Sequence, residues 1–144
     1  MGRTTMLIAS TGVFLLAAMA GDDLSWGAGA TCTAKRPCSC AGARDCNFTC
    51  ASKGCKFKCM GAGRCNVGCA KGGCTISVTG SGDTNVACAG GKCKVRAMGS
   101  SNVTVDCPGK GCTLSCTGSG NCTIKNCGRK CALSCVGSGK CSKS

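Results

Sequence analysis

The 144-residue sequence contains no histidine, no tyrosine and no glutamate, and its aromatic residues are three phenylalanines and one tryptophan. The absence of histidine excludes a histidine general base and histidine metal ligands. The scarcity of aromatic side chains argues against an ordinary globular core, which such large residues normally help to fill. Five acidic residues stand against 18 basic ones, so the formal net charge is +13. What the chain has in quantity is cysteine and glycine, with 20 and 24 residues.

The N-terminal segment predicts export from the cell. Arg3 precedes an uncharged, mostly apolar run over residues 6–20. Such a run is too short for a comfortable membrane span and is typical of a signal peptide; an uncleaved anchor is the alternative. Cleavage is expected after Ala20 or Ala30, and the product is expected to be extracellular. The chain then divides into three parts: a removed signal peptide and linker (1–30), a degenerate cap (31–45) and a cysteine-rich repetitive region (46–144).

The cysteine content predicts a disulfide scaffold. About one residue in seven is cysteine, and the number of cysteines is even. In a short exported chain both features indicate disulfides rather than free thiols. Because each short disulfide loop constrains the unfolded chain, ten of them can stabilise a fold that buries little apolar surface.

A 19-residue internal repeat organises the chain, with units that begin at residues 46, 65, 84, 101, 122 and 141. Each unit holds two strands of the form Cys-x-apolar-x-Cys. Because alternate residues of a strand share a face, the cysteines and the apolar residue point inward and the polar residues outward. A long glycine-rich turn and a short lysine-containing turn join the strands. The pattern predicts an all-β fold: a narrow flattened β-solenoid of about five 19-residue two-strand rungs, stapled by up to ten disulfides.

The fourth and fifth units depart slightly from the pattern. Val103 is expected at the middle inward position of the fourth unit, and an extra residue before Cys107 and before Cys127 predicts two β-bulges. A knotted, non-repetitive disulfide fold is the alternative to the solenoid. The strict period disfavours it.

The missing cysteines bear on disulfide connectivity. Two units lack both of the cysteines that flank a long turn. Val78 and Thr84 replace them at one turn, and Ala97 and Ser101 replace them at the next. This favours disulfides between neighbours across each turn. Vertical pairing between equivalent positions one rung apart is the rival, since the rung spacing permits it. The across-turn pairs are Cys32–Cys38, Cys40–Cys46, Cys50–Cys55, Cys59–Cys65, Cys69–Cys74, Cys88–Cys93, Cys107–Cys112, Cys116–Cys122, Cys127–Cys131 and Cys135–Cys141.

Catalytic and metal chemistry find little support in the sequence. Asp45, Asp83 and Asp106 lie in different units and are typical turn residues, so we expect no enzymatic activity, no cofactor and no small-molecule substrate. Metallothionein-like proteins are similar in cysteine content, but they depend on dense C-x-C and C-x-x-C clusters. This chain has one C-x-C, Cys38-Ser39-Cys40, and no C-x-x-C. Thiolate metal binding therefore stays a minor alternative.

A basic residue recurs in every short turn. Stacked rungs are expected to align these residues as an edge ladder that binds a polyanion, such as an anionic polysaccharide, a cell-wall polymer or a membrane surface. Solvation and protection of strand edges are the competing interpretation. Nucleic acid is disfavoured by export and by the lack of stacking aromatics. The predicted ladder consists of Lys53, Lys71, Lys92, Lys110 and Lys130, and strand residues Lys56, Lys58, Lys94, Arg96 and Lys125 add to the charge.

An outward asparagine recurs as well. Asn47, Asn66, Asn85 and Asn102 are expected to hold one equivalent position and to form an amide ladder between rungs. Asn47, Asn102 and Asn121 also begin glycosylation sequons, although the structural ladder is the favoured interpretation.

In architecture, a disulfide-rich solenoid of short rungs with T-C-T elements resembles the beetle antifreeze proteins. That resemblance implies an ice-binding face built from regular Thr-x-Thr rows on a shorter repeat. Here the outward pairs Thr75/Ser77 and Thr113/Ser115 alternate with Lys56/Lys58 and Lys94/Arg96, so no site residue is carried over, and ice binding stays a minor alternative.

The sequence therefore predicts a secreted, non-enzymatic, structural or surface-associated protein with a rigid cationic exterior that binds anionic polymers. The alternative is a cationic antimicrobial or host-defence protein that acts on anionic membranes. That alternative is disfavoured by the expectation that apolar residues point inward.

Overall fold

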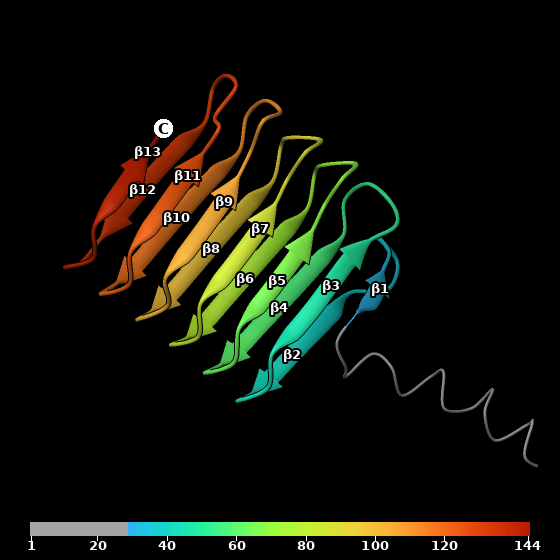
Figure 1. Cartoon of the computed structure of the whole chain (residues 1–144), viewed down its shortest axis with the longest axis horizontal. Coiled ribbons are helices and arrows are strands. Elements are labelled where there is room, and N and C mark those ends of the chain that lie inside the picture. Colours follow the sequence, from blue (N-terminus) through green and yellow to red (C-terminus); the bar gives the residue numbers. More distant parts are fainter. Residues whose placement is uncertain (1–28) are drawn as a thin grey trace, which may run out of the picture.

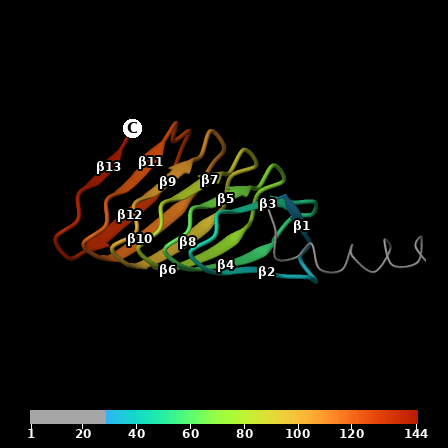
Figure 2. The same ribbon diagram turned by 60° about the horizontal axis from the view of Figure 1, so that its bottom comes forward.

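The computed structural model describes residues 29–144, and the predicted signal peptide and linker (1–30) lie outside this range apart from residues 29 and 30. The chain winds into a stack of two-strand rungs (Figure 1). Turning the molecule shows the strands of each rung in two facing layers (Figure 2). The predicted fold class is confirmed: the protein is an all-β solenoid of about six turns with 19-residue rungs, two parallel sheets and ten disulfides.

Within residues 29–144, thirteen strands form the two layers, and every pairing between neighbours is parallel. The seven-stranded sheet has the order β1-β3-β5-β7-β9-β11-β13, and the six-stranded sheet has the order β12-β10-β8-β6-β4-β2. No helix in residues 29–144 is long and apolar enough to span a membrane. The strands are β1 (Ala30–Cys32), β2 (Cys38–Gly42), β3 (Cys46–Cys50), β4 (Lys56–Gly61), β5 (Cys65–Gly68), β6 (Thr75–Gly80), β7 (Thr84–Ala87), β8 (Lys94–Gly99), β9 (Val103–Asp106), β10 (Thr113–Gly118), β11 (Cys122–Lys125), β12 (Ala132–Val136) and β13 (Cys141–Lys143).

From β2 onward the register places each strand residue beside the residue 19 positions further on, whereas β1 pairs with β3 at a separation of 18. Phe57 pairs with Ile76, Ile76 with Val95, and Val95 with Leu114, so equivalent side chains form continuous columns. The segment expected as a degenerate cap contributes β2 and most of β1, which pair with β4 and β3. It departs from the repeat at its short turn, because Cys38 pairs with Phe57 rather than with Cys55, and Cys32 and Cys38 are separated by 6 positions.

The space between the sheets is filled by single columns of cysteine, aliphatic and phenylalanine side chains. Phe57, Ile76, Val95 and Leu114 are each at most 1% exposed. The rings of Phe48 and Phe57 stack with their centroids 5.7 Å apart. Alternation of buried and exposed residues along each strand follows from the pleat, which turns successive side chains to opposite faces.

The ten disulfides staple the turns and use all 20 cysteines. Each joins the two cysteines that flank one turn, with Cα–Cα distances of 5.8–6.6 Å, inside the range that disulfide geometry allows. Vertical pairing between rungs does not occur. The pairs are Cys32–Cys38, Cys40–Cys46, Cys50–Cys55, Cys59–Cys65, Cys69–Cys74, Cys88–Cys93, Cys107–Cys112, Cys116–Cys122, Cys127–Cys131 and Cys135–Cys141.

The register corrects the start of the fourth unit. Thr84 pairs with Val103, and Val103 pairs with Cys122, so the unit begins at Val103 and not at Ser101. Val105 takes the middle inward position, beside Val86. Ser101 lies in the preceding turn, where its hydroxyl donates to the Gly80 carbonyl at 2.9 Å. Ala97 and Val103 therefore occupy the two positions where other rungs have the cysteines of the long-turn disulfide.

The two predicted β-bulges are also corrected. No residue is inserted before Cys107, because β9 continues the register of β7 to Asp106. In the fifth unit the extra residue is Asn126, which lies just after β11 and has a φ of 54°. The turn that follows is one residue shorter, with Cys127 and Cys131 separated by 4 positions where the other short-turn disulfides of the repeats span 5. The two changes compensate within the turn and leave the strands undisturbed.

Glycine is required where the long turns stack. Gly80 has a φ of 140°, and a Cβ atom there would lie 2.1 Å from the Gly61 carbonyl oxygen of the previous rung. Gly118 repeats this arrangement, with a Cβ position 2.0 Å from the Gly99 oxygen. Both the positive φ and the close backbone approach exclude a side chain.

Candidate functional site

The short turns between the sheets carry most of the unopposed positive charge. We call residues 33–37, 51–54, 70–73, 89–92, 108–111 and 128–130 the short-connector edge. They follow β1, β3, β5, β7, β9 and β11 and line one side of the stack (Figure 1). The edge contains no acidic residue, and all of its basic residues are exposed: Lys35, Arg36, Lys53, Lys71, Lys92, Lys110, Arg129 and Lys130.

The opposite edge, formed by the long turns, is close to neutral. Arg44, Arg64 and Lys140 lie there together with Asp45 and Asp83. The excess charge is therefore concentrated on one edge of the rod. A fixed, one-sided array of cations gives a strong local field that attracts polyanions.

The five predicted lysines share this edge but not a single column. Lys110 pairs with Arg129. The Lys92 amide donates to the Lys110 carbonyl at 2.7 Å, which aligns Lys92 with Gly111 rather than with Lys110. By the same 19-residue register Lys53 stands level with Gly72, and Lys71 with Gly90. The sequence-based expectation of a straight ladder is thus replaced by a staggered array in which these lysines are not direct neighbours.

Two lysines of this edge have a backbone conformation that normally belongs to glycine. Lys92 and Lys130 have φ values of 58° and 56°. Their column holds glycine in the other repeat rungs, at Gly54, Gly73 and Gly111, with φ values of 72–79°. A left-handed conformation costs a residue with a Cβ atom about 1–2 kcal/mol. Lysine therefore stands at these two positions against the local conformational preference.

The outward face of the six-stranded sheet carries a second group of cations. Lys56 and Lys58 project from β4, and Lys94 and Arg96 from β8, whereas the intervening strand β6 presents Thr75 and Ser77 at the same positions. Cationic rungs therefore alternate with hydroxyl rungs. This spacing keeps like charges about two strand separations, or about 10 Å, apart along the stack.

The same face has an exposed apolar row that the repeat pattern did not reveal. Met60, Met98 and Val136 are 44%, 53% and 65% exposed and lie in one column, with Thr79 and Thr117 between them. We call these five residues the methionine row. The sequence did contain a signal for this row. Met60, Met98 and Val136 each follow an inward-pointing strand residue, so the alternation along the strand predicts that they point outward.

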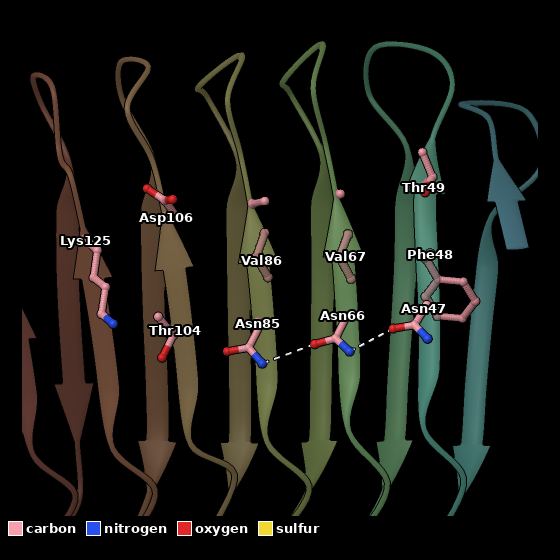
Figure 3. A pocket seen from close by; sticks show the side chains of 12 residues that line it. Asn47, Phe48, Thr49, Asn66, Val67, Asn85, Val86, Thr104, Asp106 and Lys125 are labelled. Carbon is pink, nitrogen blue, oxygen red and sulfur yellow. Dashed lines mark hydrogen bonds between the residues drawn. The ribbon is translucent and has the colours of Figure 1, made fainter. Parts of the chain in front are cut away.

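The outward face of the seven-stranded sheet is different in character. A shallow trough of about 440 Å³ extends across β3, β5, β7 and β9 to Lys125 of β11, and Figure 3 shows its lining. The amide of Asn66 donates to the side-chain oxygen of Asn47 at 2.8 Å, and Asn85 donates to Asn66 at 3.1 Å. Gly68 and Ala87 occupy the column two residues further along the strands, and their small size leaves this part of the trough open. The trough has charged side chains at one end only, Asp106 and Lys125.

Asn102 does not belong to this asparagine row, contrary to the sequence-based expectation. The fourth position of the row is Thr104, which pairs with Asn85. Asn102 precedes the strand, and its amide donates to Asp83 at 3.0 Å. The difference has the same cause as the corrected start of the fourth unit, namely a two-residue error in the alignment of that repeat.

The three carboxylates of the described chain each accept a hydrogen bond from the next rung. Asp45 accepts from the Arg64 amide at 2.8 Å, and Asp83 accepts from Asn102. Asp106 accepts from the Asn126 side chain at 2.9 Å. These bonds join successive rungs, so the carboxylates have a structural role in the stack.

Cysteine sulfurs from adjacent short turns come together in the interior. One such group consists of Cys88, Cys107 and Cys112, whose sulfur atoms lie within 4.8 Å of one another. All three sulfurs belong to disulfides. A metal would need thiolates, so this arrangement would bind metal only after reduction.

Comparison of the chain with protein-family models, with characterised proteins and with solved structures found no match. We therefore argue function from the residues and their arrangement alone.

Proposed function

We propose that the chain is a secreted, non-enzymatic protein that binds extracellular anionic polymers through its short-connector edge. The rod is rigid because every rung except two carries staples at both kinds of turn, and its cations are held on fixed backbone positions. A linear polymer with repeating acidic groups could follow such an edge over the length of the stack. The protein would thereby serve a structural or surface-associated role.

The observation that carries this proposal is the backbone conformation of Lys92 and Lys130. A strained conformation persists where something other than stability maintains it, and it is a reason to look for function. Glycine occupies the equivalent positions in neighbouring rungs, so a less strained solution exists within the same chain. We infer that the two lysines are retained for their charge.

The test compares two double variants of the full oxidised chain. The first, Lys92→Gly with Lys130→Gly, removes two charges from the short-connector edge and relieves the backbone. The matched control, Arg64→Ser with Lys140→Ser, removes two charges from the opposite edge. Binding to dextran sulfate is measured at low and at high ionic strength, with uncharged dextran as the ligand control.

We expect wild-type binding to dextran sulfate to weaken strongly with salt, because screening shortens the reach of each charge. The edge variant should bind several-fold more weakly while its melting temperature stays the same or rises. The opposite-edge control should bind within about twofold of wild type, since it keeps every cation of the short-connector edge. Equal losses in both variants, or binding that ignores salt, would remove the proposal.

A host-defence protein that damages anionic membranes is a second candidate, and the methionine row favours it because the row supplies exposed apolar side chains beside cations. Dye release from anionic vesicles separates the two functions. Release at concentrations that saturate polymer binding would favour membrane damage.

A further inference from the structure

We propose that the outward face of the six-stranded sheet is a docking surface for an anionic lipid bilayer. The surface consists of the methionine row and the two cationic columns beside it, which contain Lys56 with Lys94 and Lys58 with Arg96. It uses other residues than the short-connector edge and so does not depend on polymer binding there. Docking here means attachment to the surface and does not require the bilayer to leak.

The composition of the face fits the boundary between lipid headgroups and acyl chains. In β4 the outward sequence is Lys56, Lys58, Met60, and in β8 it is Lys94, Arg96, Met98. Each of these strands therefore runs from charge to thioether along its length. The pattern appears twice with the same polarity, so the apolar ends lie on one side of the face and the cations on the other. An amphipathic surface of this type suits an anionic membrane interface.

The apolar row is open to a flat partner. Each residue of the row is followed by a glycine at the junction of strand and long turn, from Gly61 after Met60 to Gly137 after Val136. No side chain therefore projects from the position next to the row. The row runs across five neighbouring strands, which is about 19 Å at the usual strand separation.

The methionine row favours a lipid surface over a soluble polymer as the partner. A sulfated or phosphorylated polymer would gain from the four cations but would have no apolar group to place on Met60 and Met98. Acyl chains at a bilayer surface would bury both side chains. The face contains no acidic residue between β2 and β12 that would repel anionic headgroups.

The experiment measures co-sedimentation of the full oxidised chain with vesicles. Vesicles of phosphatidylcholine alone are compared with vesicles that also contain phosphatidylserine. Met60→Ser with Met98→Ser removes the apolar groups, and Thr79→Ser with Thr117→Ser is the matched control in the same row. Lys58→Ser with Arg96→Ser tests the cationic column. An intact mass that accounts for ten disulfides and a circular dichroism spectrum that matches wild type verify that each variant is oxidised and folded.

We expect binding to the phosphatidylserine vesicles and little binding to phosphatidylcholine alone. The methionine variant should partition about tenfold more weakly, because two half-exposed side chains lose their burial in lipid. The cationic variant should lose about 25-fold, at about fivefold for each cation near an anionic surface. The threonine control should stay within about twofold of wild type.

Binding to dextran sulfate separates this proposal from the preceding one. The methionine variant should bind dextran sulfate as wild type does, whereas the Lys92→Gly, Lys130→Gly variant should bind it several-fold more weakly. If the methionine variant binds phosphatidylserine vesicles as tightly as wild type, the face is not a lipid-docking surface. The same conclusion follows if both kinds of vesicle bind equally or neither binds.

Discussion

Val78 and Thr84 stand at the two ends of a long turn, at the positions where the preceding rung has a disulfide. Val78 pairs with Cys59 and Thr84 with Cys65, and those two cysteines are bonded with a Cα–Cα distance of 6.2 Å. Val78 and Thr84 are buried, at 2% and 1% exposure. The turn between them is held by rung stacking alone.

An eleventh disulfide should therefore form at this turn. In the double variant Val78→Cys, Thr84→Cys, the sequence separation and the columns are those of Cys59–Cys65, so the geometry already suits a bond. Closing such a short loop should raise the free energy of unfolding by about 2 kcal/mol. The intact mass and the denaturation midpoint measure both effects. Val78→Cys alone is the control, because it changes the buried volume without a partner. A double variant that keeps two free thiols would show that the backbones of the two turns differ.

Stacked turns should tolerate no side chain at Gly80. Gly80→Ala places a methyl group 2.1 Å from the Gly61 oxygen and adds it to a residue with a φ of 140°. Gly54→Ala is the matched control, because Gly54 also has a positive φ but its Cβ position is free of neighbours within 4 Å. We expect the free energy of unfolding of the Gly54 variant to fall by about 1–2 kcal/mol, because alanine disfavours a positive φ. The Gly80 variant should lose clearly more, since its rung must also shift. Thermal denaturation of the oxidised proteins gives the comparison, and equal losses would contradict the steric explanation.

Disulfide reduction should unfold the protein, and it should begin at the C-terminal end of the stack. The cysteines of the Cys135–Cys141 disulfide are exposed, whereas both cysteines of Cys88–Cys93 are fully buried. A reductant must reach the sulfur atom, so the exposed bond should open first. Alkylation of the released thiols after limited reduction, followed by peptide mass analysis, identifies the order. Complete reduction should abolish the β-sheet circular dichroism, because no conventional core remains to hold the rungs. Retention of that signal would show that stacking suffices without staples.

The asparagine ladder should contribute measurably to the stability of the fold, and most strongly at its central residue. Asn66 takes part in two side-chain hydrogen bonds, one with Asn47 and one with Asn85, whereas Asn47 takes part in the first alone. Asn66→Ala should therefore lower the free energy of unfolding by more than Asn47→Ala does, with about 1 kcal/mol or less for each exposed bond. Guanidinium denaturation of the two variants makes the comparison. Equal effects would mean that the amides are held by water and not by one another.

Much of the fold was predictable because each rung repeats the same local chemistry. The alternation in Cys46-Asn47-Phe48-Thr49-Cys50 by itself assigns the inner and outer faces of a strand. The loss of cysteines in couples across a turn favoured disulfides such as Cys50–Cys55, but the rung spacing left vertical pairing open, and the structure decides between the two. The strand faces and the period therefore follow from residues close in sequence, and the disulfide pairing follows from them only in part.

The candidate site was only partly predictable, because it depends on how one rung lies on the next. The lysines of the short turns were found, but Lys53, Lys71 and Lys92 occupy different columns, and only backbone pairing between rungs reveals this. The methionine row was missed because Met60 and Met98 are separated by a full rung that carries threonine.

The sequence by itself determined the 19-residue period, the inward direction of the cysteines and the assignment of charge to one set of turns. These properties depend on strand pleat and on short loops, which are local. The tertiary structure decided the start of the fourth rung at Val103, the stagger of the lysines and the alignment of Met60 with Met98. Their cause is the hydrogen-bonded register between parallel strands, which holds equivalent backbone positions together even where the side chains that mark the repeat have been replaced.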